Sequence, residues 1–302
     1  MIRIVSVSLG PSSRDSSVEL ELLGERFLLE RLGTDANIER FARFLYQYDG
    51  IADVLCLGGI NLGIHWGDRF YPFTQVGNIL RHVKQTPVVD GSGLKATLEP
   101  MTLDFLQQQG ITDLAQTRTL MMDAFARHWL ARAIASSCAE VVYGDLMFSF
   151  NIPLPIRSLK AMNFWARTLL PMIARLPHNW AFTTGVHGNT IVGGFDNYYQ
   201  WADLIAGDFT YIRHYMPDQL KGKIILTNTI TNEDLALLRE RGIRYLVTST
   251  PEIEGRTFAT NVMEGVFVSL LGRPPGELSA RDYIQLAEDI NWQPLVREIS
   301  PA

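Results

Sequence analysis

The sequence predicts a mixed α/β protein of two domains, and three observations predict it. The chain has 302 residues, of which 47% are hydrophobic, enough for more than one core of ordinary size. Its second half alternates short apolar runs with helical patterns, which is typical of a parallel sheet covered on both faces. Its first half mixes hairpins with helices. We expect an N-terminal mixed α/β substrate domain over residues 1–114, and a Rossmann-like nucleotide-binding domain with C-terminal helices over residues 115–302.

The first domain is expected to open with a strand, IRIVSVSLG, followed by a hairpin that turns at residues 23–25. The run NIERFARFLYQY places apolar side chains on one helix face, with Thr34 or Asp35 as its cap. A buried strand, ADVLCLGGIN, precedes a second hairpin that turns at residues 67–68. A further helix, a short strand in TPVVDGSGLK and a helix that stops at Gly110 complete this domain.

The second domain is expected to contain five apolar strands: RTLMMD, EVVYGD, DLIAGD, KIILTN and RYLVTS. Helices are predicted to begin near Ala124, Arg157, Asn197 and Asn232. Ligands of such sheets bind outside the carboxyl ends of the strands, where the strand order reverses. We therefore predict a polar, cofactor-binding crevice there; the alternative is that these residues cap the helices that follow. The polar residues that end or follow the strands are Asp123, Asp145, Asp208, Asn228 and Ser249.

Charge and composition exclude several classes of partner. The net charge is −5, with 27 basic against 32 acidic residues spread along the chain, so no basic face for nucleic acid or anionic lipid is expected. Small molecules are the expected partners, and a homo-oligomer is left open. Cys56 and Cys138 lie in apolar runs, which indicates reduced thiols of a cytoplasmic protein. The first residues lack a signal-peptide pattern, and six scattered histidines predict no metal site.

An apolar segment over residues 146–180 tests the expectation of a soluble protein. Four basic residues interrupt it before 18 uncharged residues accumulate, so it is not expected to span a membrane. We predict a buried helix over about 157–174, kinked near Pro171. The alternative is an interfacial helix that associates peripherally with a membrane or a partner.

The stretch TLMMDAFARHWLARAIASSCAEVVYGD has the pattern of a nucleotide-binding strand, turn, helix and strand. Dinucleotide sites use glycines in the turn and an acidic residue about 20 positions on for the ribose. Asp145 follows Asp123 at about that spacing, but the turn has Ala124 and Ala126 in place of glycines. Arg127 offers charge to a phosphate at the helix N-terminus. Asp145 would repel a 2′-phosphate, so NAD is preferred over NADP; the alternative is an α/β unit with a solvated arginine.

Eight runs lie along nearly the whole chain: IVSVSLG, ELLGERFLLERLGTD, LGGIN, TPVVDGSGLK, YGDLMF, DLIAGDFTYIRHYMP, ILTNTIT and LVTSTPEIEGRTFATNVMEG. Together they resemble the proteins identified as quinate 5-dehydrogenases, related in name to the shikimate/quinate dehydrogenases. The resemblance covers nearly the whole chain, although the substrate serine pair and the glycine-rich NADP loop of ordinary shikimate dehydrogenases are missing from it. It implies a catalytic α/β domain before a Rossmann-like domain.

The resemblance also implies a lysine–aspartate pair, in which the lysine exchanges the proton of the alcohol that is oxidised. The run VVDGSGLK offers Asp90 and Lys95 around a flexible turn. The match is one of chemistry and not of position, because the family places its aspartate differently. The alternatives are a solvated lysine at a helix start and an aspartate that serves as a turn or cap residue.

A loop and helix start after the fifth strand, STPEIEGRTFATNVMEG, contain further substrate candidates. Arg256 is suited to a bidentate contact with a substrate carboxylate, and Thr250 and Asn261 lie near it in sequence. The alternatives are a loop-bracing role for Arg256 and a helix-capping role for Asn261.

We therefore expect an NAD(P)-dependent oxidoreductase that transfers a hydride to or from a small hydroxylated carboxylic acid such as quinate. Lys95 would handle the hydroxyl proton and Asp90 would orient it. The alternative is a non-redox binding or regulatory protein with a degenerate Rossmann domain, because a fold does not fix a function.

Overall fold

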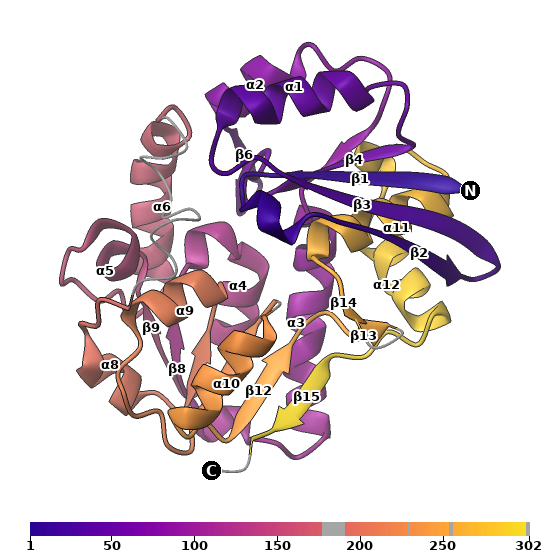
Figure 1. The fold of residues 1–302 in the computed structure, drawn as a ribbon. Coiled ribbons are helices and arrows are strands. Elements are labelled where there is room, and N and C mark those ends of the chain that lie inside the picture. The colour runs from indigo at the N-terminus through magenta and orange to yellow at the C-terminus, as the bar shows by residue number, and fades with distance from the viewer. Residues whose placement is uncertain (177–190, 229, 254–255, 300–302) are drawn as a thin grey trace.

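The protein has two α/β domains stacked along one axis (Figure 1). The computed structural model describes residues 1–176, 191–228, 230–253 and 256–299. The mixed α/β class predicted from the sequence is confirmed, because both main sheets are built mostly from parallel strands flanked by helices.

The first sheet has five strands, and all of its pairs except β2 with β3 are parallel. The two-residue turn Leu23-Gly24 joins β2 to β3 with positive φ at both positions, as the hairpin prediction required. The strands in spatial order are β2 (Ser16–Leu22), β3 (Glu25–Gly33), β1 (Ile2–Ser8), β4 (Val54–Gly58) and β7 (Val88–Val89).

One face of this sheet is covered by α1 (Ile38–Tyr48), and a small hairpin and α2 follow at its edge. The cap of α1 differs from the prediction: Asn37, and not Thr34 or Asp35, accepts from the Arg40 N–H, since Asp35 has a positive φ in the preceding turn. The remaining elements of this region are β5 (Gly63–Trp66), β6 (Arg69–Pro72) and α2 (Thr74–Leu80), and β5 and β6 form the predicted second hairpin.

The second sheet has six strands, of which the edge strand β15 alone is antiparallel to its neighbour. Its core strands are buried on both faces: Leu120 packs into one apolar cluster, whereas Met121 packs into another. This explains why these strands are apolar throughout. In spatial order they are β15 (Leu295–Glu298), β12 (Tyr245–Thr248), β11 (Ile224–Thr227), β10 (Leu204–Ala206), β8 (Arg118–Met121) and β9 (Glu140–Tyr143).

The helices of the second domain begin close to the predicted positions, with three differences, of which one is α9 (Phe209–Tyr215), a helix that was not predicted. Residues 124–126 form a 3₁₀ turn, so the helix expected near Ala124 begins at His128. A short helix that was not predicted begins at Asp145. These helices are α4 (His128–Ser137), α5 (Asp145–Phe150), α6 (Leu159–Ile173), α8 (Asp196–Trp201), α9 (Phe209–Tyr215) and α10 (Asn232–Glu240).

The apolar segment after residue 146 contains α6, which buries one stripe of side chains and continues two residues beyond Pro171. Phe164 and Met172 are exposed on its other side. Among the residues that the structure describes, no helix is both long and apolar enough to cross a membrane.

The chain passes between the domains more than once. Helix α3 (Ser92–Gln108) leads from the first sheet to the second, and α11 (Thr260–Leu271) and α12 (Ala280–Asp289) return to pack on the first. The sequence assigned these C-terminal helices to the second domain. They join the first domain instead: α11, which is buried nearly all round, packs on β1 and β4, and α12 packs on α3 and α11. A short hairpin, β13 (Glu252–Ile253) with β14 (Arg256–Thr257), precedes α11.

Candidate functional site

A cleft of about 670 Å³ lies between the two domains, and the carboxyl ends of the parallel strands of both sheets line it. In each sheet this is where the strand order reverses: β8 lies between β9 and β10, and β1 lies between β3 and β4. Ligands of open α/β sheets bind at such positions. Lining residues at strand ends are Ser8, Gly58 and Asp90 from the first sheet, and Asp123, Asp208 and Asn228 from the second.

A buried ionic cluster, which we call the Arg127 cluster, forms the floor of the cleft on the side of the second sheet. Arg127 donates to Glu99 of α3, from Nε to Asp123 Oδ2 at 3.1 Å, and to Asp208 Oδ2 at 3.4 Å. The backbone N–H of Asp208 donates to Asp123 Oδ1. Because Arg127 is 5% exposed, these ion pairs are screened far less than surface pairs. The cluster therefore ties α3 to the ends of β8 and β10.

The carboxylates of the Arg127 cluster have different proton affinities. Burial raises the pKa of Asp123 to about 7, against the opposing effect of Arg127. Burial also raises the pKa of Glu99. Burial acts in the same direction on Asp208, but Arg127 and the Thr210 N–H more than offset it, and the pKa of Asp208 is lowered. Neighbouring carboxylates with such opposed environments are a pattern found at sites of proton transfer.

The turn predicted to face a pyrophosphate is arranged differently from that expectation. The guanidinium of Arg127 is already matched by three carboxylates. Asp145, predicted to hold the ribose, is 1% exposed, and it accepts from the backbone N–H of Ala124 and Phe125 at 3.1 and 2.7 Å. Its hydrogen bonds hold the turn in place, and it does not line the cleft. Burial raises its pKa to about 8.

The predicted lysine–aspartate pair is brought to the cleft, but its two members are engaged separately. The carboxylate of Asp90 accepts from the backbone N–H of Leu62 and Ser92. Lys95, half-buried in the first turns of α3, interacts electrostatically with Glu99 and Asp208. The orienting role predicted for Asp90 therefore has no contact to support it, and its alternative as a turn residue matches the geometry.

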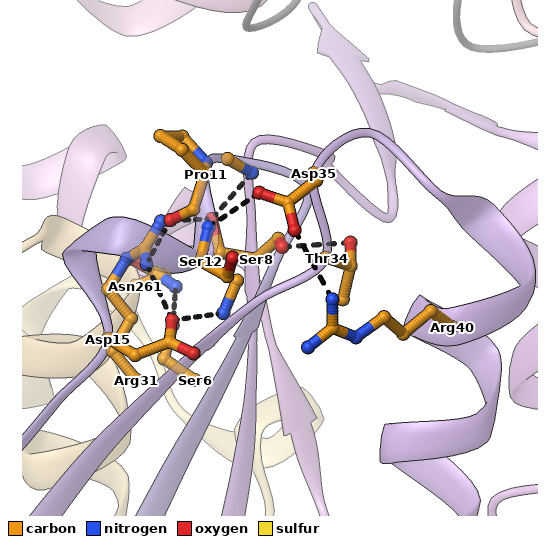
Figure 2. Close-up of polar contacts among 12 residues, drawn as sticks. Ser6, Ser8, Pro11, Ser12, Asp15, Arg31, Thr34, Asp35, Arg40 and Asn261 are labelled. Atoms are coloured by element: carbon orange, nitrogen blue, oxygen red, sulfur yellow. Dashed lines mark hydrogen bonds and ion pairs between the residues drawn. The ribbon is translucent and has the colours of Figure 1, made fainter.

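The other predicted residues are divided between the cleft and its surroundings. Asn261 lines the cleft and donates from Nδ2 to Ser6 Oγ at 3.0 Å, so it does not act as the cap of α11 (Figure 2). Thr250 is buried and donates to the carbonyl of Asn228, which itself lines the cleft. The side chain of Arg256 lies outside the described residues.

A polar wall at the ends of β1 and β3 was not predicted from the sequence. Arg31 lines the cleft and donates to the Pro11 carbonyl, to Asp15 Oδ1 at 3.1 Å and to Ser8 Oγ at 3.2 Å (Figure 2). Asp15 also accepts from the Gly33 N–H, so the loop after β1 is fixed against β3. The sequence does not single out Arg31, because it is one of four charged residues in β3.

Another buried carboxylate, Glu264 of α11, accepts hydrogen bonds from the start of α3. It accepts from the backbone N–H of Gly91 and Gly93 and from the hydroxyl of Tyr283. Burial and the nearby Asp90 raise its pKa to about 7. Gly93 is required here, because a Cβ would lie 2.5 Å from Glu264 Oε1.

Two cations of the cleft wall have no direct ion pair among the described residues, although Lys95 interacts electrostatically with Glu99 and Asp208. Lys95 and Arg14 line the cleft, and neither forms an ion pair with any residue in the described ranges. The carboxylates, by contrast, are each engaged: Glu30 by Arg3, Asp123 and Asp208 by Arg127, Asp234 by Arg213, and Asp90 by two backbone N–H groups. The cleft is therefore electrostatically suited to an anion. Among the described residues, no group of three His, Cys, Asp or Glu is arranged to hold a metal ion.

The fold and the cleft define a two-domain α/β protein whose second domain is Rossmann-like. The chain belongs to the family described as Domain of unknown function (DUF8754), whose model matches residues 93–299. Residues 3–90 match a second model, described as Domain of unknown function (DUF8753). A comparison with curated proteins finds no match.

Solved structures that resemble the chain are of different kinds. A galactofuranose binding protein is 9% identical, with a TM-score of 0.36, over 96% of this chain and 99% of its own. An ornithine carbamoyltransferase from Pyrococcus furiosus is 13% identical, with a TM-score of 0.31, over 76% and 73%. A dipicolinate synthase chain from Bacillus halodurans is 11% identical, with a TM-score of 0.28, over 90% and 98%. At these TM-scores the likeness says nothing about ligand or activity.

Proposed function

We propose that the protein binds a small hydroxylated carboxylic acid, of which quinate is an example, in the cleft between its domains. The observation that carries the proposal is Lys95: it lines the cleft, is half-buried, and makes no ion pair with a described residue. Partial burial strengthens its attraction for an anion relative to a surface lysine. The polar wall and the strand ends supply donors and acceptors for hydroxyl groups.

A second candidate is hydride transfer between NAD(P) and the same acid, as the resemblance to quinate 5-dehydrogenases implies. The position of the cleft at the strand-order reversal of the second sheet favours it, because Rossmann-like domains bind nucleotides there. The neutralised Arg127 and the buried Asp145 oppose it, since the phosphate and ribose contacts would need other residues. We therefore place binding of the acid first.

The experiment is calorimetric titration of the wild type and of Lys95→Met with quinate. Loss of an ion pair in a partly buried cleft should weaken binding by about tenfold or more, which is about 1.4 kcal/mol per factor of ten. Lys160→Met, which removes an exposed lysine outside the cleft, is the matched control and should bind as the wild type does. Equal affinity in the wild type and Lys95→Met would overturn the assignment of Lys95.

The two candidates separate in a second titration, with NAD, NADH, NADP and NADPH. Hydride transfer requires that one of the four binds, and a ligand at a hundredfold excess over its dissociation constant stabilises the fold by about 2.7 kcal/mol. If quinate binds and no dinucleotide raises the melting temperature, the protein is a binder of the acid and not a dehydrogenase.

A further inference from the structure

The N-terminus of α11 lies at the cleft without a cap. Ala259, Thr260 and Asn261 line the cleft, and the N-cap position is Ala259, whose side chain has no acceptor. The first turn of α11 contains no acidic residue. The first N–H groups of a helix have no partner inside the helix, and a cap side chain or a ligand must satisfy them.

Two other helices that begin at the cleft have satisfied N-termini. Asp90 and Glu264 accept from the Ser92 and Gly93 N–H groups of α3. Thr231 and Asp234 form a capping box on α10. By contrast, the backbone N–H groups of Thr260 and Asn261 have no hydrogen-bond acceptor within the part of the chain that the structure describes.

The side chain of Thr260 gives an independent indication of a ligand. Thr260 is 5% exposed and lines the cleft, yet its Oγ1 has no hydrogen-bond partner among the described residues. A buried hydroxyl without a partner costs folding free energy, so such groups call for a specific explanation. A ligand atom beside this hydroxyl and the two N–H groups would supply the missing partner.

The electrostatics of this corner favour an oxyanion. The N-terminal end of a helix carries a partial positive charge that stabilises anions, and Lys95, which forms no direct ion pair with a described residue, lines the same cleft. Two nearby carboxylates, Asp90 and Glu264, already accept from backbone N–H groups of Leu62, Gly91 and Gly93. Asn261 is held by its bond to Ser6, which fixes the start of α11 against β1.

We infer that the first turn of α11 binds the oxyanion of the ligand. The donors are the backbone N–H groups of Thr260 and Asn261 and the hydroxyl of Thr260. This inference rests on the proposed function, because it assigns the carboxylate of the hydroxy acid to one end of the cleft. A phosphate ester presents the same acceptor chemistry, so inorganic phosphate is a second probe.

The test is a titration of the ¹⁵N-labelled full chain with quinate, methyl quinate and inorganic phosphate, followed at the amide signals of Thr260 and Asn261. Quinate should shift both signals, and methyl quinate, which lacks the charge, should bind at least tenfold more weakly. Thr260→Val should weaken quinate binding by about tenfold. Thr102→Val is the matched control, since Thr102 is buried on α3 and does not line the cleft.

The outcomes distinguish the proposed function from the oxyanion site at the first turn of α11, which we call the subsite. If quinate binds but leaves both amide signals and the Thr260→Val affinity unchanged, the subsite is wrong and the proposed function stands. If phosphate shifts both amides while quinate does not bind, the subsite stands and the proposed function fails. If neither quinate nor phosphate shifts the amide signals of Thr260 and Asn261, the proposed oxyanion site at the start of α11 is wrong.

Discussion

Burial raises the pKa of several carboxylates in this chain. Asp123, Asp145 and Glu264 each have a pKa raised to between about 7 and 8, with burial as the largest cause. Each therefore keeps its proton in the folded state at pH values where it would lose it in the unfolded chain, whose aspartate pKa is about 4. Folding is linked to proton uptake at these positions.

Asp145 gives a pH prediction because it lies outside the cleft. Its folded pKa is about 8. Its contribution to stability is fully present below about pH 4 and is lost as the pH rises through 8, because the folded state binds the extra proton in that window. Asp145→Asn, which cannot ionise, should reduce the fall of unfolding free energy with pH by up to about 1.4 kcal/mol per pH unit.

Urea unfolding at a series of pH values between 4 and 8 measures this slope. Asp104→Asn, which changes an exposed carboxylate of α3, is the control and should keep the wild-type slope. An unchanged slope in Asp145→Asn would mean that Asp145 is ionised in the folded protein, held by its two N–H donors.

For single residues, the sequence indicated which side chains lie at the cleft better than it indicated which residues they contact. The polar residues at strand ends were found because a strand is apolar and its end is not, and Asp123, Asp208 and Asn228 do line the cleft. Glu99 was missed because its partner Arg127 is far from it along the chain, and nothing local marks their contact. Asp145 had the spacing of a ribose-binding residue, but the helix that begins at Asp145 places it under the turn.

The start of α3 lies close to the start of α11. Gly91 has a φ of +91°, and a Cβ there would lie 3.1 Å from the backbone nitrogen of Asn261 in α11. The same residue donates its N–H to Glu264. A glycine is therefore required both by the backbone conformation and by the contact between the two helices.

Gly91→Ala should lower the free energy of unfolding by about 1–3 kcal/mol, since it adds strain and steric overlap. Gly77→Ala is the opposite case: Gly77 is inside α2, and a Cβ at this position would have no atom within 4 Å, so alanine should stabilise the protein by about 0.5–1 kcal/mol. Thermal and urea unfolding of both variants measure the difference. A neutral Gly91→Ala would show that α11 can move away from α3 without cost.

The elements that the sequence predicted well are those specified by neighbouring residues. Both hairpins formed at the expected turns, because two-residue loops with glycine select that geometry. The packing of α11 and α12 in the first domain was not predicted. An apolar helix can pack on either sheet, and contacts between residues far apart in sequence decide which one it covers.

For the whole molecule, the first sheet depends on the last helices of the chain. Ile4, Val54 and Cys56 are fully or nearly fully buried in a cluster completed by α11 and α12. The structure has two main sheets, but the chain does not complete one before it begins the other, since α11 returns to the first sheet. Residues 1–114 alone therefore lack the helices that complete the core of the first domain.

A chain ended at residue 250 should lose the cooperative unfolding of its first domain, because one face of the first sheet is uncovered. A chain ended at residue 292 is the control, since it lacks only the edge strand β15 and keeps α11 and α12. Urea unfolding followed by circular dichroism and by tryptophan fluorescence measures both. An unchanged midpoint for the shorter chain would contradict the dependence described above.

The return of α11 to the first sheet also matters while the protein is being synthesised. About 150 residues separate the end of α3 from the start of α11, and chain elongation proceeds at about 5–20 residues per second. For roughly 8–30 s, the emerging N-terminal sheet has an apolar face that α3 covers only in part and that α11 cannot yet reach. We expect a nascent chain of this kind to bind holding chaperones at that face, and to release them once α11 and α12 have emerged and packed against it.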